Sequence, residues 1–275
     1  MEKREIEGDA LKNMVRRGLK AALDLLVPRG CLVCERSLEL SEEHLCRECL
    51  EDLPQTYYWL RKFNPMADRF NALIQDKFNS QLNISHIDYA FAAALFFYRD
   101  ESEYRRIPYQ IKYHGNLPAG RFFGQMLGQK IASAEHFADV DAVIPVPLHW
   151  ARHWKRGYNQ AEVIASEVSA ALGVELRPDI LQRCRRTRTQ TKLTIEGKTA
   201  NVQGAFRVRT SISNSNGNRN KKAEASDITR LKHLLIIDDV FTTGNTALAC
   251  YSALRTILPP SIRISIATLA FVGET

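Results

Sequence analysis

The segment from Leu234 to Thr246 combines residue types that can bind a phosphorylated sugar. Four apolar residues are followed by two carboxylates, Asp238 and Asp239, and then by a short loop that contains Gly244. Ligands of open α/β sheets bind beyond the carboxyl ends of the strands, where helix N-termini and backbone N–H groups attract anions. The loop can therefore hold a phosphate while the two acids accept hydrogen bonds from two sugar hydroxyls. The chain has no G-x4-G-K-[ST] sequence, which excludes a P-loop nucleotide site.

Two C-x2-C pairs are typical of a metal site. They are Cys31 with Cys34 and Cys46 with Cys49, separated by eleven residues. Four thiolates can surround one zinc ion as a tetrahedron at about 2.3 Å, and this closed shell leaves no position for a substrate. The spacing therefore predicts a structural zinc site. An iron–sulfur or redox role and unligated thiols are the alternatives, and His44 could compete as a ligand.

Basic residues gather in two segments that can meet a polyanion. Residues 142–161 hold Arg152, Lys155 and Arg156 and no acid, and residues 183–198 hold six bases and one acid. The whole chain has 38 Lys and Arg against 31 Asp and Glu, a net charge of +7. This balance favours diphosphate, phosphorylated metabolites or nucleic acid as ligands without choosing among them. The alternatives are a solvated basic turn for the first segment and a charge run facing nucleic acid for the second.

Alternating strand and helix patterns indicate the elements that must position these residues. Buried strands are expected at 88–98, 140–146, 234–237 and 262–272, and helices at 118–134, 159–172 and 246–257. This alternation predicts an α/β fold with a mostly parallel, twisted sheet flanked by helices.

Changes in composition and hydrophobic pattern along the sequence divide the chain into two predicted domains. Residues 1–85 hold an amphipathic helix, the cysteine pairs and an irregular aromatic stretch, and are expected to form a small zinc-ribbon-like module. Residues 86–275 are expected to form the α/β domain. Within it, residues 210–230 turn polar, rich in Ser and Asn, and predict a disordered surface insertion. The N-terminal helix is expected to pack on the protein itself, with a membrane surface or a partner helix as the alternative.

The chain is expected to be cytoplasmic and to have no membrane span. No apolar run reaches 18 residues, and the acidic N-terminus lacks the pattern of a secretion signal. In a reducing compartment the cysteines should be thiols or metal ligands rather than disulfides.

The segment 234–246 resembles the thirteen-residue motif for 5-phosphoribosyl 1-diphosphate (PRPP) in type I phosphoribosyltransferases. Further segments resemble the competence protein ComF and its GntX-like relatives: I-K-Y-x-G at 111–115, P-V-P-L-H at 145–149, R-G-Y-N-Q-A at 156–161, T-x3-L at 189–193 and N-V-x-G-A-F at 201–206. A pair of zinc knuckles after an apolar helix also fits this family. The resemblance covers about residues 25 to 270 and implies a type I phosphoribosyltransferase-like fold.

The resemblance also implies roles for individual residues. PRPP would be bound by Asp238, Asp239, Thr242, Thr243, Gly244, Asn245 and Thr246. Its diphosphate would be held by Arg156, Gly157, Tyr158 and Asn159. The catalytic residues would be Asp238, Asp239, Arg188 and Lys192. The last two lie on a segment that would close over PRPP and exclude water. Mg²⁺ would arrive with PRPP, in addition to a structural Zn²⁺ on the four paired cysteines.

Three functions follow from these features. The first is transfer of a phosphoribosyl group from PRPP to an unidentified acceptor with release of diphosphate, a pentosyl-transferring reaction. The second is non-catalytic handling of single-stranded DNA during natural transformation, together with DNA-uptake proteins. Basic loops with nearby aromatic residues fit both functions. The third and weakest is a zinc-containing transcriptional regulator that senses a purine intermediate, for which no recognition helix is evident.

Overall fold

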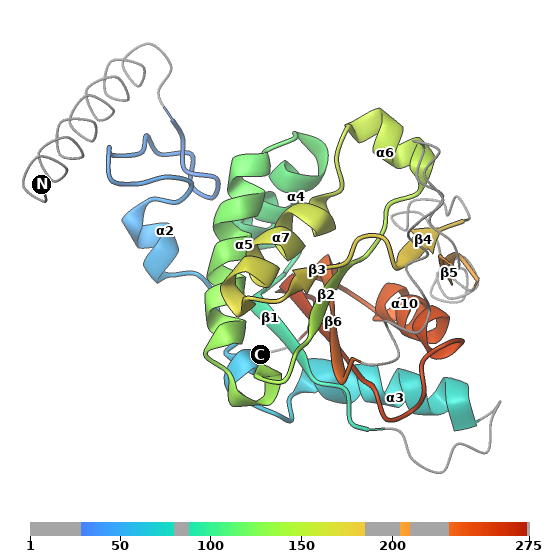
Figure 1. Ribbon diagram of the computed structural model, residues 1–275. Coiled ribbons are helices and arrows are strands. Elements are labelled where there is room, and N and C mark those ends of the chain that lie inside the picture. Colours follow the sequence, from blue (N-terminus) through green and yellow to red (C-terminus); the bar gives the residue numbers. More distant parts are fainter. Residues whose placement is uncertain (1–28, 80–87, 185–203, 210–230, 274–275) are drawn as a thin grey trace, which may run out of the picture. The chain divides into compact units, whose positions relative to one another are not determined.

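The computed structural model describes residues 29–79, 88–184, 204–209 and 231–273 (Figure 1). The predicted N-terminal helix, the predicted insertion at 210–230 and the predicted loop residues Arg188 and Lys192 lie outside these ranges. The chain forms two compact units. Among the described residues, one unit comprises 29–53 and Glu101–Ile107, and the other comprises 54–100 and the chain from Pro108 onward.

The larger unit is built on a parallel sheet, as the alternating pattern predicts. Its strands, in spatial order, are β1 (Ala92–Phe97), β7 (Arg263–Phe271), β6 (His233–Phe241), β2 (Ala142–Pro145) and β3 (Glu175–Leu176). Every described pairing in this sheet is parallel, and Val143 of β2 lies opposite Leu235 of β6. The residues of β1 and β2 are all buried, which explains why these strands read as continuous apolar runs. The carboxyl ends of β2 and β6 therefore lie side by side.

Helices cover both faces of the sheet (Figure 1). The packed pair on one face is α5 (Leu117–Ala132) and α7 (Gln160–Leu172), and the pair on the other is α3 (Pro65–Asn79) and α10 (Asn245–Arg255). Glycines on α5 let α7 approach closely, because a Cβ at Gly128 would lie 2.8 Å from the Cβ of Ala171. Shorter elements complete the described chain: α2 (Arg47–Glu51), α4 (Arg106–Tyr113), α6 (Trp150–Arg156), the 3-10 turns η1 (Tyr58–Leu60), η2 (Glu103–Arg105) and η3 (Glu135–Phe137), and the antiparallel pair β4 (Leu181–Arg183) and β5 (Phe206–Val208).

Helix α3 corrects the sequence interpretation, which treated this stretch as irregular. The helix follows Asn64, whose side-chain oxygen accepts a hydrogen bond from the N–H of Ala67 at 3.0 Å. Pro65 then takes the first helical position, where its missing N–H costs nothing. The helix buries Phe70 and Phe78, and both rings pack edge-on against Tyr251 of α10. This aromatic packing fixes α10, whose N-terminus follows the predicted phosphate loop.

Candidate functional site

The turn between β6 and α10 forms the predicted phosphate loop. Strand β6 continues through Phe241 and α10 begins at Asn245, so only Thr242, Thr243 and Gly244 connect them. Gly244 has φ +81°, and a Cβ there would lie 2.6 Å from Leu73 Cδ1 and 2.8 Å from the Phe241 ring. Glycine is therefore required for two reasons, the left-handed backbone and the close packing. The turn leads into the N-terminus of an eleven-residue helix, where backbone N–H groups favour an anion.

Arg69 on α3 fixes the backbone of this turn through hydrogen bonds to carbonyl oxygens. Its Nη1 atom donates hydrogen bonds to the carbonyl oxygens of Thr242 and Val272, both at 3.0 Å. The guanidinium also lies 5.4 Å from the centroid of the Phe271 ring. Sequence reasoning missed Arg69 because its partners are distant in the chain and no local motif marks it. We assign it a positioning role for the turn.

The sequence pattern ended the strand at Ile237, but β6 continues to Phe241, so Asp238 and Asp239 lie within the strand. The two acids have different surroundings. Consecutive residues of a strand point to opposite faces of the sheet. Asp239 is 3% exposed, its Oδ1 atom accepts from the N–H of Val240 at 3.0 Å, and its Oδ2 atom lies 3.0 Å from Lys112 Nζ. Asp238 accepts from the N–H of Asp239 at 2.8 Å and acts electrostatically on Cys250 of α10. The buried Asp239 and the partly exposed Asp238 thus have different hydrogen-bond partners.

Lys112 is the second residue that sequence reasoning left without a role. In the sequence it is marked only by the I-K-Y-x-G segment, and the structure shows that it is the cation that pairs with the buried Asp239. Burial opposes the charge on Lys112, but attraction to Asp239 and then to Asp238 outweighs it and raises the lysine pKa. The ammonium therefore stays protonated at physiological pH.

The electrostatics of the site keep its negative charge low. Burial, followed by repulsion from Asp239, raises the pKa of Asp238 to about 8, against an attraction to Lys112 that acts in the other direction. The site thus combines the Lys112–Asp239 ion pair with an Asp238 carboxyl whose raised pKa favours its protonated form. Arg183 of β4 interacts electrostatically with Asp238, and burial, followed by repulsion from Arg152, lowers the pKa of its guanidinium.

The predicted diphosphate residues surround the start of α7. Gly157 ends α6 with φ +77° and donates its N–H to the carbonyl of His153, and Asn159 caps α7 by accepting from the N–H of Ala161 at 3.2 Å. The Asn159 amide also donates to the carbonyl of Val146 at 3.1 Å. Asn159 therefore anchors the loop that follows β2 through its own hydrogen bonds.

The side chains next to Asn159 connect this loop to α4. The Tyr158 hydroxyl donates to the Ile111 carbonyl at 2.7 Å. Arg156 donates to Gln160 Oε1 at 3.0 Å, and its guanidinium lies 5.2 Å from the centroid of the Tyr113 ring. Ile111 and Tyr113 flank Lys112 in sequence. The contacts thus tie the predicted diphosphate loop to the helix that supplies the lysine.

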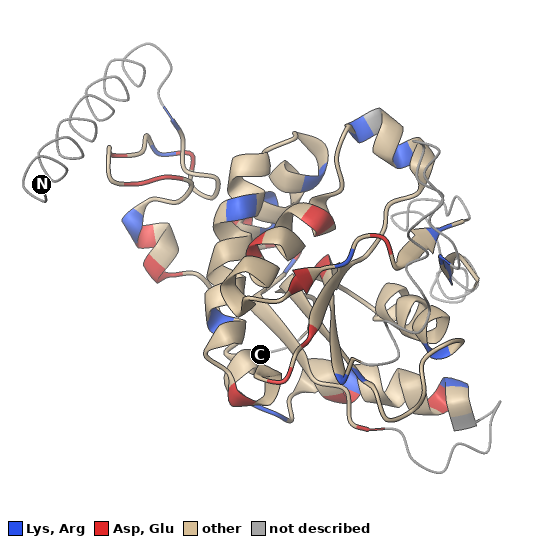
Figure 2. Cartoon of the chain, in the orientation of Figure 1, with Lys and Arg blue, Asp and Glu red and all other residues tan. Residues whose placement is uncertain are grey.

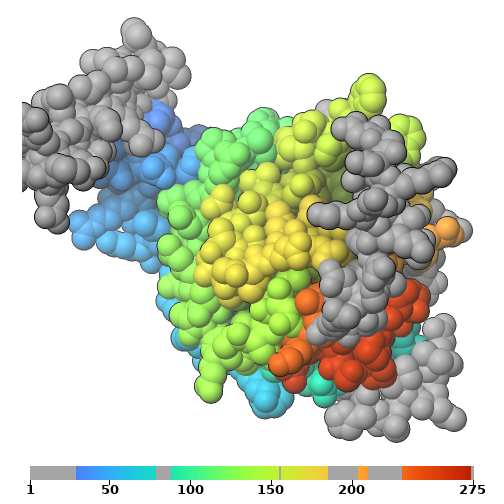
Figure 3. Space-filling model, viewed as in Figure 1, coloured from blue at the N-terminus to red at the C-terminus, as the bar shows by residue number. Residues whose placement is uncertain are grey.

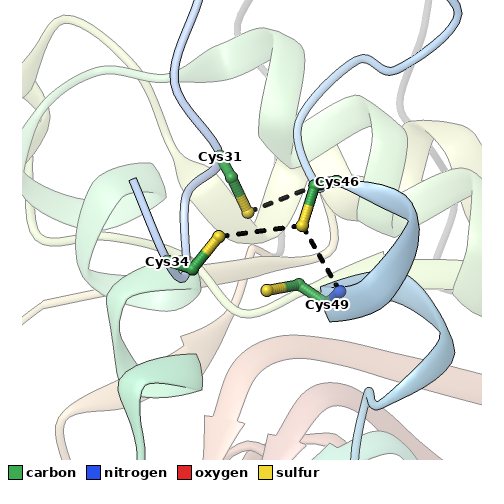
Figure 4. A group of neighbouring side chains, drawn as sticks. All are labelled: Cys31, Cys34, Cys46 and Cys49. Carbon is green, nitrogen blue, oxygen red and sulfur yellow. Dashed lines mark hydrogen bonds between the residues drawn. The ribbon is translucent and has the colours of Figure 1, made fainter. Parts of the chain in front are cut away.

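The four paired cysteines converge on one point in the smaller unit (Figure 4). Their sulfur atoms all lie within 4.8 Å of one another, and Cys34 Sγ lies 3.7 Å from Cys46 Sγ. Sulfurs at about 2.3 Å from a tetrahedral zinc are separated by about 3.8 Å, so the cluster fits this ion. The predicted ligand set can therefore bind a structural zinc.

Backbone N–H groups donate hydrogen bonds to two of these sulfur atoms. The N–H of Cys46 donates to Cys31 Sγ at 3.4 Å, and the N–H of Cys49 donates to Cys46 Sγ at 3.5 Å. Burial opposes ionisation of Cys31, but hydrogen bonds from the backbone of Cys34 and Cys46 outweigh it and lower its pKa to about 7. A thiolate is the form that binds metal, so the fold prepares this ligand.

A segment distant in sequence braces both cysteine pairs. Arg106 donates to the carbonyl of Val33 at 3.2 Å and forms an ion pair with Glu35 at 2.7 Å. The Tyr104 hydroxyl donates to the carbonyl of Cys49 at 2.9 Å. These contacts explain why residues 101–107 belong to the cysteine unit, an assignment that the local sequence pattern does not reveal.

Comparison with known proteins identifies relatives of the chain. No protein-family model matches it. Competence protein F of Haemophilus influenzae is 31% identical over 106 residues, which are 38% of this chain and 40% of that protein. DNA utilization protein YhgH of Salmonella typhi is 24% identical over 229 residues, or 81% of this chain and 88% of the relative. The same-named protein of Escherichia coli K12 is 30% identical over 106 residues, 39% of its length.

The predicted resemblance to the ComF-like competence family is confirmed. The chain matches about two fifths of competence protein F and most of the Salmonella relative. No helix of the described ranges is long and apolar enough to span a membrane. The sheet of the chain brings together the β6 acids, Lys112 of α4 and the loop after β2, which are far apart in sequence.

Proposed function

We propose that this chain binds PRPP together with Mg²⁺ at the β6–α10 turn and transfers the phosphoribosyl group to a small acceptor, releasing diphosphate. The observation that supports the proposal is the acid pair of β6, which Val240 and Phe241 separate from a glycine-dependent turn, with Lys112 paired to one acid. The 5-phosphate of the sugar is held by the N-terminus of α10 and the hydroxyls of Thr242, Thr243 and Thr246. The two ribose hydroxyls donate to Asp238 and Asp239.

Lys112 has a specific part in this proposal. A ribose hydroxyl that reaches Asp239 Oδ2 must share it with Lys112, which lies 3.0 Å away. Lys112 can then turn one of its three donors towards an oxygen of the diphosphate. Without PRPP, the lysine balances the charge of the Asp239 carboxylate. When PRPP is bound, the lysine offers a positive charge to the diphosphate leaving group.

Transfer breaks the C1–oxygen bond, and its electron pair leaves with diphosphate. The acceptor nucleophile forms the new bond to C1 through an oxocarbenium-like state. Oxygen ligands suit Mg²⁺, and the diphosphate and ribose hydroxyls would supply them in this scheme. When bound, Mg²⁺ makes diphosphate a better leaving group. Arg156 and the loop after β2 orient the diphosphate by charge-assisted hydrogen bonds.

Calorimetry of PRPP binding in the presence of Mg²⁺ tests the proposal. The Asp239→Asn variant should lose binding and keep its fold, whereas Asp100→Asn, an exposed acid outside the site, should bind like the parent. Release of labelled diphosphate, with a small-molecule extract as the source of acceptors, then tests transfer. Unchanged affinity in Asp239→Asn would refute the site, and tight binding without diphosphate release would refute catalysis alone.

A second function, handling of single-stranded DNA, has its own support. The named relatives are a competence protein and DNA utilization proteins. The chain carries a net charge of +7, and its residues 142–161 contain bases and no acid. These features favour a polyanion. In this role PRPP would act as a structural or regulatory ligand, and both roles place the chain in the cytoplasm.

The cysteine unit has a structural role in both functions. We propose that Cys31, Cys34, Cys46 and Cys49 hold one zinc ion that stabilises residues 29–53. The converging sulfurs support this assignment. Because metal binding to such a site also drives folding of the segment around it, the smaller unit should depend on the ion.

A further inference from the structure

Helix α6 exposes two tryptophans that no part of the proposed PRPP site uses. Trp150 is 71% exposed and Trp154 is 87% exposed, more than any other large hydrophobic side chain of the described ranges. By contrast, Trp59 is buried at 2%. Exposed apolar surface of this size commonly marks a binding site. The helix stands out from the body of its unit at the end of the sheet (Figures 1 and 3).

The geometry of α6 holds the two rings on one side. Residues four apart on a helix lie on the same face, about 6 Å apart along the axis. His149 caps the first turn by accepting from the N–H of Ala151 at 3.2 Å, and Gly157 ends the helix in the left-handed conformation. The opposite face carries Arg152 and Arg156, which are partly buried against the protein. The short helix is thus fixed at both ends with its tryptophans directed outward.

The charge around the tryptophans is positive. Arg152 and Arg156 lie on α6 itself, and Figure 2 shows basic and no acidic segments along this helix. Arg156 lies over the ring of Tyr113, and Tyr113 packs against Tyr109 at 5.0 Å between ring centroids. Both tyrosines are about half exposed. A second pair of exposed aromatic rings therefore begins where α6 ends.

We propose that Trp150 and Trp154 are a stacking platform for the bases of single-stranded DNA, whose phosphates are attracted by the net positive charge of α6. Exposed rings with neighbouring cations are the combination that binds single strands without sequence preference. This assignment rests on the second proposed function and names the surface that performs it.

The spacing of the rings favours a single strand over a duplex. Rings about 6 Å apart along α6 exceed the 3.4 Å base separation within a stacked strand. A flexible single strand can spread two neighbouring bases to this distance, whereas a duplex hides its base faces. A membrane is a poorer occupant because α6 has only Ala151 as a further apolar residue, and membrane-surface helices bury a long apolar face.

Fluorescence anisotropy with a labelled oligothymidylate of about 12 nucleotides, within known site sizes of ~4–16, tests the platform. Trp150→Ala and Trp154→Ala should each weaken binding by about fivefold to 150-fold, the range that stacking of one base supplies. The Trp150→Phe and Trp154→Phe variants keep an aromatic ring for stacking and should retain most of the affinity. Phe63→Ala, which removes another exposed ring (64%), should bind like the parent.

Intrinsic fluorescence gives an independent readout. The buried Trp59 should be unaffected by DNA, so quenching of the parent by the unlabelled oligonucleotide should disappear in the Trp150→Ala/Trp154→Ala double variant. A double variant that binds DNA with parental affinity would refute the tryptophan platform but not the proposed DNA-handling function. A parent that binds no DNA would overturn both. Loss of binding to anionic vesicles, with DNA binding unchanged, would assign the tryptophans to a membrane surface instead.

Discussion

Lys112 Nζ lies 3.0 Å from Asp239 Oδ2, which joins helix α4 to the end of the central strand β6. The carboxylate is almost fully buried, while the lysine side chain is 31% exposed and can reach solvent or a ligand. The pair therefore couples the stability of the fold to the chemistry of the site. An entering hydroxyl or phosphate acts on both members at once.

Replacing Lys112 by methionine should destabilise the protein by about 1–3 kcal/mol, because the buried Asp239 carboxylate loses its charged partner. Urea unfolding of the variant measures the change. Lys112→Arg keeps a cation and should recover part of the loss. In the Lys112→Met/Asp239→Asn double variant the unpaired charge is gone, so its stability should exceed that of Lys112→Met. Additive losses in this cycle would contradict the coupling.

Asp238 should make stability depend on pH. Its folded-state pKa of about 8 exceeds the unfolded value of about 3.9. Because the folded state holds the proton more firmly, this contribution is fully present below about pH 4 and is lost as pH rises through about 8. Asp238→Asn removes the ionisation, so its melting temperature relative to the parent should increase from pH 5 to pH 9.

The matched control for this pH series is Asp100→Asn, since Asp100 is exposed. Its difference from the parent should stay constant over the same range. A constant difference for Asp238→Asn as well would show that burial does not perturb this carboxyl.

Much of the fold follows from local pattern, and the exceptions have physical reasons. The strand at Leu234–Ile237 and the turn at Gly244 are visible because apolar runs and glycine report directly on burial and backbone conformation. The order of the strands confirms the predicted parallel sheet. Helix α3 is signalled by Asn64-Pro65 at its start and by buried apolar residues four apart, Met66, Phe70, Ile74 and Phe78. The sequence interpretation took this stretch as irregular because polar residues separate these positions.

The site was only partly predictable for a different reason. The acids and the turn residues are consecutive, so a motif contains them. Lys112 of α4 reaches Asp239 in β6, and Arg69 of α3 reaches the carbonyl of Thr242 in the turn. Such contacts depend on tertiary packing that no local spacing encodes. The same holds for Tyr104 and Arg106, which brace the cysteine pairs from a segment that belongs by sequence to another region.

Gly244→Ala and Gly157→Ala should separate backbone strain from steric conflict. Both glycines have φ near +80°, but a Cβ at Gly157 meets nothing within 4 Å, while one at Gly244 meets Leu73 at 2.6 Å. The left-handed backbone costs alanine about 1–2 kcal/mol. Gly157→Ala should lose that amount, and Gly244→Ala should lose more and distort the turn. Equal losses in chemical denaturation would argue against the close packing.

Cys46→Ser should remove zinc and unfold the smaller unit first. The cysteine contributes one of four sulfurs, and its backbone N–H also donates to Cys31 Sγ. Elemental analysis of freshly purified protein should find one zinc per chain in the parent and less in the variant, with new proteolytic cleavage within residues 29–53. Cys184→Ser changes an exposed cysteine outside the cluster and should keep the metal. A parent without zinc would refute the assignment.

Arg156 should act on PRPP rather than on DNA phosphates. Its guanidinium is already oriented by Gln160 and by the Tyr113 ring, beside the loop after β2, which favours a fixed contact with diphosphate. Arg156→Ala should therefore weaken PRPP binding in calorimetry. Removing one phosphate contact to a single strand lowers the slope of log affinity against log salt by about 0.7, and we expect a smaller change. Arg47→Ala, an exposed site on α2, is the control. A full loss of DNA affinity with unaltered PRPP affinity would assign Arg156 to the DNA-handling surface of α6.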